Sequence, residues 1–156
     1  MTPALESYQK WSGSNPNEIV ALELPFTTYI GGFKINGFID RVEKTPDGEY
    51  VVIDYKTGGK KKKVDAANSP QLNLYALALK ENPDYGKLPV KAIFFYVEKP
   101  EGEQLIEYEV DPEKVEEVKS ILEGYVAAIQ EKKFDATPEM FTCKWCQYSD
   151  ICEEAM

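Results

Sequence analysis

Two charged residues near the end of an apolar segment have the types and spacing that metal-assisted chemistry needs. The segment from Val51 to Lys56 reads VVIDYK, so Asp54 and Lys56 are two residues apart. In an extended strand such residues share one face, about 6 to 7 Å apart. A carboxylate binds hard cations such as Mg2+ or Mn2+, and an ammonium orients water or stabilises charge on a phosphate. A strand end that simply meets solvent has the same residue types, so the motif alone does not decide.

A second acidic residue, Asp40, closes the apolar stretch Gly37–Ile39. If the two segments pair as strands, Asp40 lies beside Asp54, and the backbone carbonyl of Tyr55 offers a further oxygen ligand. The alternative is that Asp40 pairs with Arg41 or caps a strand end. An acidic residue in an apolar strand is costly unless it is paired or metal-bound. Two of them on consecutive segments favour a shared metal site.

Three strand-like segments must position these residues. They are rich in β-branched and aromatic residues, and turn sequences separate them: Gly31-Gly32 first, then Thr45-Pro46-Asp47-Gly48. The segments cover residues 18–30, 33–43 and 49–56. They predict an antiparallel meander in which the segment with Asp40 lies next to the segment with Asp54.

The rest of the chain alternates helical and strand patterns. Asn68 or Ser69 caps a helix that has Pro70 in its first turn and ends near Asn82, and Asp111 caps a long helix. Strand patterns cover residues 90–98 and 104–110. The order β-β-β-α-β-β-α predicts an α/β protein with a mixed sheet flanked by helices. No full helical pattern precedes the first strand, so the first core helix is expected to be missing.

Composition bounds the class of protein. The 156 residues fit one domain, residues 1–156, with residues 141–156 as a cysteine-rich C-terminal tail. No apolar run is long enough to span a bilayer and the N-terminus does not resemble a signal peptide, so a cytoplasmic protein without a membrane partner is expected. The absence of histidine excludes a Ser-His-Asp triad and a Cys2His2 zinc site within this chain.

The net charge of −9 means that any nucleic-acid binding depends on a local basic patch. Such a run follows Lys56 in the sequence and consists of Lys60, Lys61, Lys62 and Lys63. Judged alone, the run is as typical of a solvated loop as of phosphate contacts.

Three motifs together resemble a known family. Gly37-Phe38-Ile39-Asp40-Arg41, Asp54-Tyr55-Lys56-Thr57-Gly58 and Gln71-Leu72-Asn73-Leu74-Tyr75 resemble, in order and spacing, the successive motifs of the RecB-like PD-(D/E)XK nucleases. The resemblance implies a restriction-endonuclease-like fold and metal-dependent hydrolysis of DNA. It implies that Asp40 and Asp54 bind the metal, that Lys56 is catalytic, and that Gln71 and Tyr75 line the DNA path. Glu23 resembles a further family position on the first strand.

The cysteines add a second resemblance. Cys143, Cys146 and Cys152 are an odd number within ten residues, which is unlike a disulfide framework and typical of ligands. Their C-x2-C-x5-C spacing resembles the last three ligands of the [4Fe-4S] cluster in the iron–sulfur branch of this family, found in AddB-type nucleases and some UvrD-type helicases. Such a cluster takes four cysteines. The fourth, and a family metal-binding histidine, would precede Met1. A zinc site or three free thiols are the alternatives.

The resemblance implies the C-terminal nuclease domain of a UvrD-type helicase. Its partners would be DNA, contacted also by Lys60, Lys61 and Lys62, and a helicase domain or subunit of a larger protein. It would be an exonuclease in DNA repair or recombination, with a [4Fe-4S] cluster in the full-length protein. Two other hypotheses stay open: a non-cutting DNA-binding module that keeps the fold, and a structural metal-binding domain organised by the cysteines.

Overall fold

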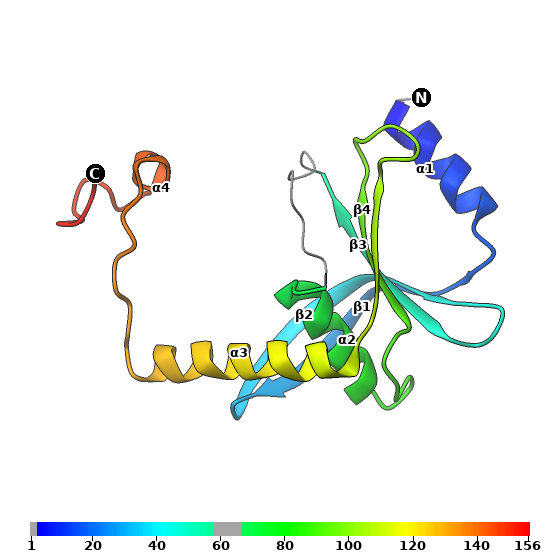
Figure 1. Ribbon diagram of the computed structural model, residues 1–156, viewed down its shortest axis with the longest axis horizontal. Helices are drawn as coiled ribbons and strands as arrows, with labels where there is room; N and C mark the ends of the chain where they lie inside the picture. Colours follow the sequence, from blue (N-terminus) through cyan, green and yellow to red (C-terminus); the bar gives the residue numbers. More distant parts are fainter. Residues whose placement is uncertain (1–2, 58–66) are drawn as a thin grey trace.

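Residues 3–57 and 67–156 are described by a computed structural model, in which a mixed sheet carries helices on both faces (Figure 1). In that part of the chain the sheet has five strands: β1 (Glu18–Ile30), β2 (Phe33–Lys44), β3 (Tyr50–Lys56), β4 (Lys91–Tyr96) and β5 (Leu105–Glu109). The strands lie in chain order, with β3 and β4 parallel and the other neighbours antiparallel. The predicted meander and the mixed α/β sheet are confirmed.

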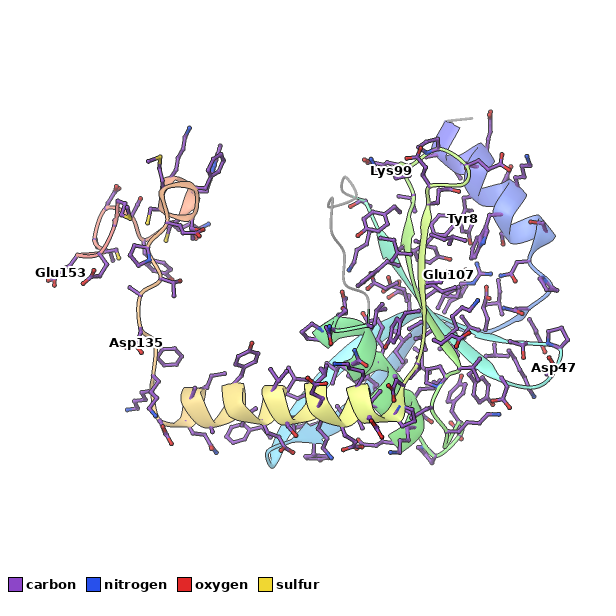
Figure 2. The ribbon with its side chains drawn as sticks, in the orientation of Figure 1. Tyr8, Asp47, Lys99, Glu107, Asp135 and Glu153 are labelled. Carbon is purple, nitrogen blue, oxygen red and sulfur yellow. The ribbon has the colours of Figure 1, made fainter. Side chains whose placement is uncertain are left out.

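One face of the sheet, here called the α1 face, is covered by helix α1 (Pro3–Ser14). Its Tyr8 and Trp11 pack on Phe95 of β4, with ring centroids 5.7 and 4.6 Å apart, and Figure 2 labels Tyr8 between the helix and the sheet. The expectation that the first core helix would be missing is therefore wrong. The apolar stripe of this helix is narrow and its Leu5 is exposed, which makes the helical periodicity weak in the sequence.

The opposite face, here called the α2 face, carries helix α2 (Pro70–Glu81), which connects β3 to β4. A parallel pair requires a crossover connection, and a crossover helix lies over a face of the sheet. The Ser69 hydroxyl accepts the N–H of Leu72, so the predicted N-cap is confirmed. Buried Tyr75 and Leu72 pack in one cluster with Val52 of β3. Helix α2 is thereby held directly over the end of β3.

The C-terminal part extends away from the sheet (Figure 1). Helix α3 (Pro112–Gln130) is capped by Asp111 and packs its buried Val115 beside α2, whereas Tyr125 in its second half is 60% exposed. The short helix α4 (Met140–Trp145) lies farther out on the same arm. Within the described residues, no helix has both the length and the apolar character that crossing a membrane requires.

Candidate active site

The strands β2 and β3 separate where Asp40 and Asp54 come together. The last residues in register are Arg41 and Ile53, so Asp40 and Asp54 follow one step beyond this pair. There the Asp40 carboxylate replaces a backbone carbonyl of β2 as the hydrogen-bond acceptor, because its Oδ2 accepts the N–H of Tyr55 at 2.9 Å. The N–H and C=O groups of one strand residue point to the same side. The Tyr55 carbonyl is therefore directed toward the Asp40 side of β3.

Asp54 is buried, with 2% of its surface exposed, and shares the α2 face with Lys56. The Lys56 ammonium Nζ lies 2.5 Å from Asp54 Oδ2 as an ion pair. Apart from this ion pair, the oxygen has no hydrogen-bond partner among the described residues. A carboxylate oxygen has more than one lone pair, so Asp54 Oδ2 keeps one for a cation.

Helix α2 adds Gln71 and Tyr75 to this pair and closes a ring of polar contacts. The Lys56 ammonium donates to Gln71 Oε1 at 2.7 Å, and Gln71 Nε2 donates to the Tyr75 hydroxyl at 3.1 Å. The Tyr75 hydroxyl in turn donates to Asp54 Oδ1 at 3.4 Å. Gln71 and Tyr75 meet because residues four apart share a helix face. The helix therefore orients both the carboxylate and the ammonium of β3.

Burial governs the protonation of Asp54 and Tyr75 in this ring of polar contacts. It raises the pKa of Asp54; the neighbouring Lys56 ammonium opposes this effect and the charge of Asp40 adds to it. Burial also raises the pKa of Tyr75 to about 12, so this hydroxyl is a neutral donor at physiological pH. Ionised Asp54 is thus a charge in an unfavourable environment, and a bound cation would lower its cost.

The oxygens of this site suit a hard divalent ion. They are the carboxylates of Asp40 and Asp54 and the carbonyl of Tyr55. In the described part of the chain no three or more His, Cys, Asp or Glu side chains form a group that could hold a metal. Mg2+ needs no such cage, since one or two carboxylates suffice when water and phosphate oxygens complete its shell. The two carboxylates and the carbonyl therefore fit Mg2+ or Mn2+.

Two aromatic residues outside the sequence motifs complete the site. Phe94 is the β4 partner of Asp54, and the Lys56 ammonium lies 5.0 Å from the centre of its ring. Phe26 of β1 packs edge-on against Tyr75, with ring centroids 5.9 Å apart. Both residues stand in apolar strands whose sequence carries no signal of this role, because their partners come from other elements.

Other predicted site residues lie apart from the ring. Lys60, Lys61 and Lys62 fall outside the described residues, so their DNA contacts stay a prediction. Glu23 is an exposed residue of β1 with a φ of 49°, and it belongs to no described group of three metal-ligating side chains.

The cysteine tail lies on the extended C-terminal arm. Cys143 is in α4, Cys146 directly follows that helix, and both, like Cys152, are free thiols. The described residues bring together no metal-binding group that contains them. The iron–sulfur assignment therefore stays a prediction.

A family model described as the PD-(D/E)XK nuclease superfamily matches residues 1–153. The chain belongs to this superfamily. The match agrees with the restriction-endonuclease-like fold that the three sequence motifs predict, a mixed sheet with flanking helices. Members of this superfamily are nuclease-type domains, which is the class expected from the sequence.

Two phage proteins resemble this PD-(D/E)XK domain. The gene 69 protein of Mycobacterium phage L5 is 30% identical over 156 residues, covering 94% of this chain and 50% of the relative. The gene 69 protein of Mycobacterium phage D29 is 32% identical over 162 residues, covering 95% and 56%. This chain thus spans about half the length of these relatives. The crystal structure of SSO0001 is similar in fold, with a TM-score of 0.56 and 21% identity over 98% of this chain and 68% of that protein.

Proposed function

We propose that this chain is a metal-dependent deoxyribonuclease whose cutting centre consists of Asp40, Asp54 and Lys56. The observation that carries the proposal is the ion pair between buried Asp54 and half-buried Lys56 beside Asp40. Paired carboxylates next to an ammonium supply the groups that metal-assisted phosphodiester hydrolysis needs. Membership of a nuclease superfamily supports the same reaction.

Each group has a separate role in this proposal. Asp40, Asp54 and the Tyr55 carbonyl hold Mg2+ or Mn2+, and the bound ion supplies Lewis-acid polarisation of the phosphate. Lys56, held between Asp54 and Gln71, orients the attacking water and compensates for negative charge that develops on the phosphate. Water adds to phosphorus as the bond to the leaving oxygen breaks, so the protein forms no covalent intermediate.

The two motif residues of α2 differ in access to DNA. Gln71 is exposed, so it is able to contact a strand while its amide holds Lys56. Tyr75 is 7% exposed and acts on Asp54 instead of on bulk DNA. In the proposal Gln71 lies on the DNA path with Lys60, Lys61 and Lys62. Tyr75 lines that path indirectly, through its hydrogen bonds to Gln71 and Asp54.

The wider context rests on the sequence resemblance. It comprises exonuclease action, a cytoplasmic helicase–nuclease of DNA repair or recombination as the parent protein, and a [4Fe-4S] cluster held in part by Cys143, Cys146 and Cys152. Protein purified without oxygen and loaded with iron and sulfide tests the cluster, because iron–sulfur proteins absorb in the visible range. A colourless product would leave the thiols to zinc or to no metal.

Cleavage of end-labelled single- and double-stranded DNA with Mg2+ or Mn2+ tests the proposed activity. Cleavage is expected to require the metal and to fall by at least about a hundredfold in Asp54→Ala and Lys56→Ala. The matched controls are Lys91→Ala and Glu107→Ala, which break an ion pair of 2.9 Å between β4 and β5, away from the site. These controls should cut as the unaltered chain does.

Two results would contradict the proposal. Cleavage that survives in Asp54→Ala and Lys56→Ala would mean that another centre, or a contaminant, cuts the DNA. DNA binding without cleavage by the unaltered chain, in either metal, would favour the non-cutting module.

A further inference from the structure

Directly behind the cutting centre, on the α1 face, Arg41 and Tyr55 join β2 to β3. Successive side chains of a strand point to opposite faces, so these two residues lie on the face opposite to Asp40 and Asp54. Arg41 Nη1 donates to the Tyr55 hydroxyl at 3.1 Å and to the Tyr8 hydroxyl of α1 at 2.9 Å. The residue that follows Asp40 is thus hydrogen-bonded to the residue that follows Asp54.

The Arg41 side chain is 1% exposed and belongs to a polar network. It forms an ion pair with Glu43, whose carboxylate also accepts the side-chain amides of Asn15 and Asn17 at 2.9 Å. Among the described residues Arg41 Nε has no hydrogen-bond partner. Desolvation of a buried ion pair can cancel its attraction. Stability alone is therefore a weak reason for this network, whereas the fixing of strand register is a better attested use.

The network matters at this place because the backbone ladder ends here. Arg41 and Ile53 are the last paired residues of β2 and β3. Beyond them, Tyr55 is attached to β2 through side chains: its N–H donates to Asp40 and its hydroxyl accepts from Arg41. Consecutive residues of β2 therefore hold Tyr55 by its backbone on one side and by its ring on the other.

We propose that Tyr8, Arg41 and Tyr55 are positioning residues, whose hydrogen bonds on the α1 face keep the Asp40 carboxylate against the Tyr55 amide and so set its place in the cutting centre. Helix α1 acts on the site through the sheet, although it contributes no side chain to the ring. The inference rests on the proposed function for what Asp40 binds. The positioning itself is testable without metal or DNA.

Hydrogen exchange of individual amides in the metal-free chain, followed by NMR, tests the positioning. In Tyr55→Phe, which removes the hydroxyl that accepts from the Arg41 guanidinium, the amide of residue 55 should exchange at least about tenfold faster, the factor expected for one hydrogen bond to a charged group. The amide of Val52, in the paired part of β3, should keep its rate. The matched control is Tyr50→Phe, at the other end of β3 where Tyr50 packs on Tyr85, and it should leave residue 55 unchanged.

A second variant and a second readout separate positioning from general stability. Tyr8→Phe should speed exchange at residue 55 in the same direction, since it removes the partner of Arg41 from α1. Uniformly faster exchange along β3, or no change at residue 55, overturns the inference. In cleavage assays, Tyr8→Phe should raise the Mn2+ concentration for half-maximal rate about tenfold and keep the rate at saturating Mn2+.

The two proposals fail in different ways. If the unaltered chain cuts no DNA but residue 55 responds as expected, the proposed nuclease function fails and the positioning of Asp40 stands. If the chain cuts DNA but neither the residue-55 amide nor the metal dependence responds, the positioning fails and the nuclease stands.

Discussion

The hydroxyl of Tyr75 on α2 donates a hydrogen bond to Asp54 on β3, with 3.4 Å between Oη and Oδ1. Both residues are buried, so no water replaces the donor easily when the hydroxyl is removed. The contact also connects the two sequence motifs that carry the acidic residue and the helix. Helix α2 therefore covers the core and also belongs to the site.

Tyr75→Phe should lower the rate of DNA cleavage by about tenfold, the loss expected for one hydrogen bond to a charged group. Because this hydrogen bond lowers the pKa of Asp54, its removal should raise that pKa further. Asp54 must be ionised to bind metal, so the variant should lose activity at a higher pH than the unaltered chain. Rate measured against pH at one fixed metal concentration below saturation checks this shift.

Tyr108→Phe is the matched control for this substitution. It removes the hydrogen bond of 3.1 Å from the half-buried Tyr108 phenol to Asn73 on the same helix, away from Asp54. The control should leave the acidic limb of the profile in place. If both variants shift the acidic limb of the pH profile equally, the Tyr75 contact has no particular influence on the pKa of Asp54.

Gln71→Ala should lower kcat by about 10- to 100-fold, because the Lys56 ammonium loses its acceptor on α2. Steady-state kinetics with a DNA substrate separate this effect from a contact to DNA, which would raise KM and leave kcat unchanged. Gln9→Ala, an exposed glutamine of α1, serves as control. An increase in KM alone would assign Gln71 to DNA binding without a role in orienting Lys56.

Asp54→Asn should increase the free energy of unfolding at pH 7 in the presence of a chelator. Folding raises the pKa of Asp54, chiefly by burial, so the folded chain loses stability as pH rises from the ordinary pKa through the raised one, and the full penalty is present above the raised value. Below the ordinary pKa near 3.8 the group is protonated in both states and the penalty vanishes. The gain should therefore shrink as pH falls through the acid range. Denaturant unfolding at several pH values measures it, and a loss of stability at pH 7 would contradict it.

Mn2+ should stabilise the unaltered chain and leave Asp54→Asn unaffected. A ligand at about 100 times its Kd that binds the folded state alone adds about 2.7 kcal/mol to stability. Thermal unfolding with and without Mn2+ measures the effect. The control is Asp47→Asn, an exposed residue of the turn between β2 and β3 that is labelled in Figure 2, and it should respond like the unaltered chain.

Gly37→Ala should lower the free energy of unfolding by about 1–3 kcal/mol, the usual cost of overpacking. A Cβ at Gly37 would lie 2.7 and 2.8 Å from two atoms of the Phe26 ring, which packs on Tyr75. Phe26→Leu in the same chain should recover part of the loss, and a double-mutant cycle measures the coupling. Gly13→Ala, where a Cβ meets no described atom within 4 Å, should not lower stability.

Much of the architecture was determined by the sequence itself. The turn residues between the first three strands, the cap at Ser69 and the apolar run of β4 are local signals, and the elements formed where these signals stand. The two-residue spacing of Asp54 and Lys56 was enough to place both on one face. Asp40 beside Asp54 followed from the pairing of two strands joined by a short turn.

The tertiary structure decided which groups meet across elements. The crossover from β3 to parallel β4 laid Gln71 and Tyr75 over Asp54 and Lys56. Gln71 contacts Lys56 across 15 positions of the sequence, and Tyr75 contacts Asp54 across 21. It also brought Tyr8 to Arg41 across 33 positions and buried that charge behind the site. The spacing of apolar residues in the sequence predicts the face of an element on which a side chain lies. Its partner on that face depends on the packing of distant segments, which no local pattern contains.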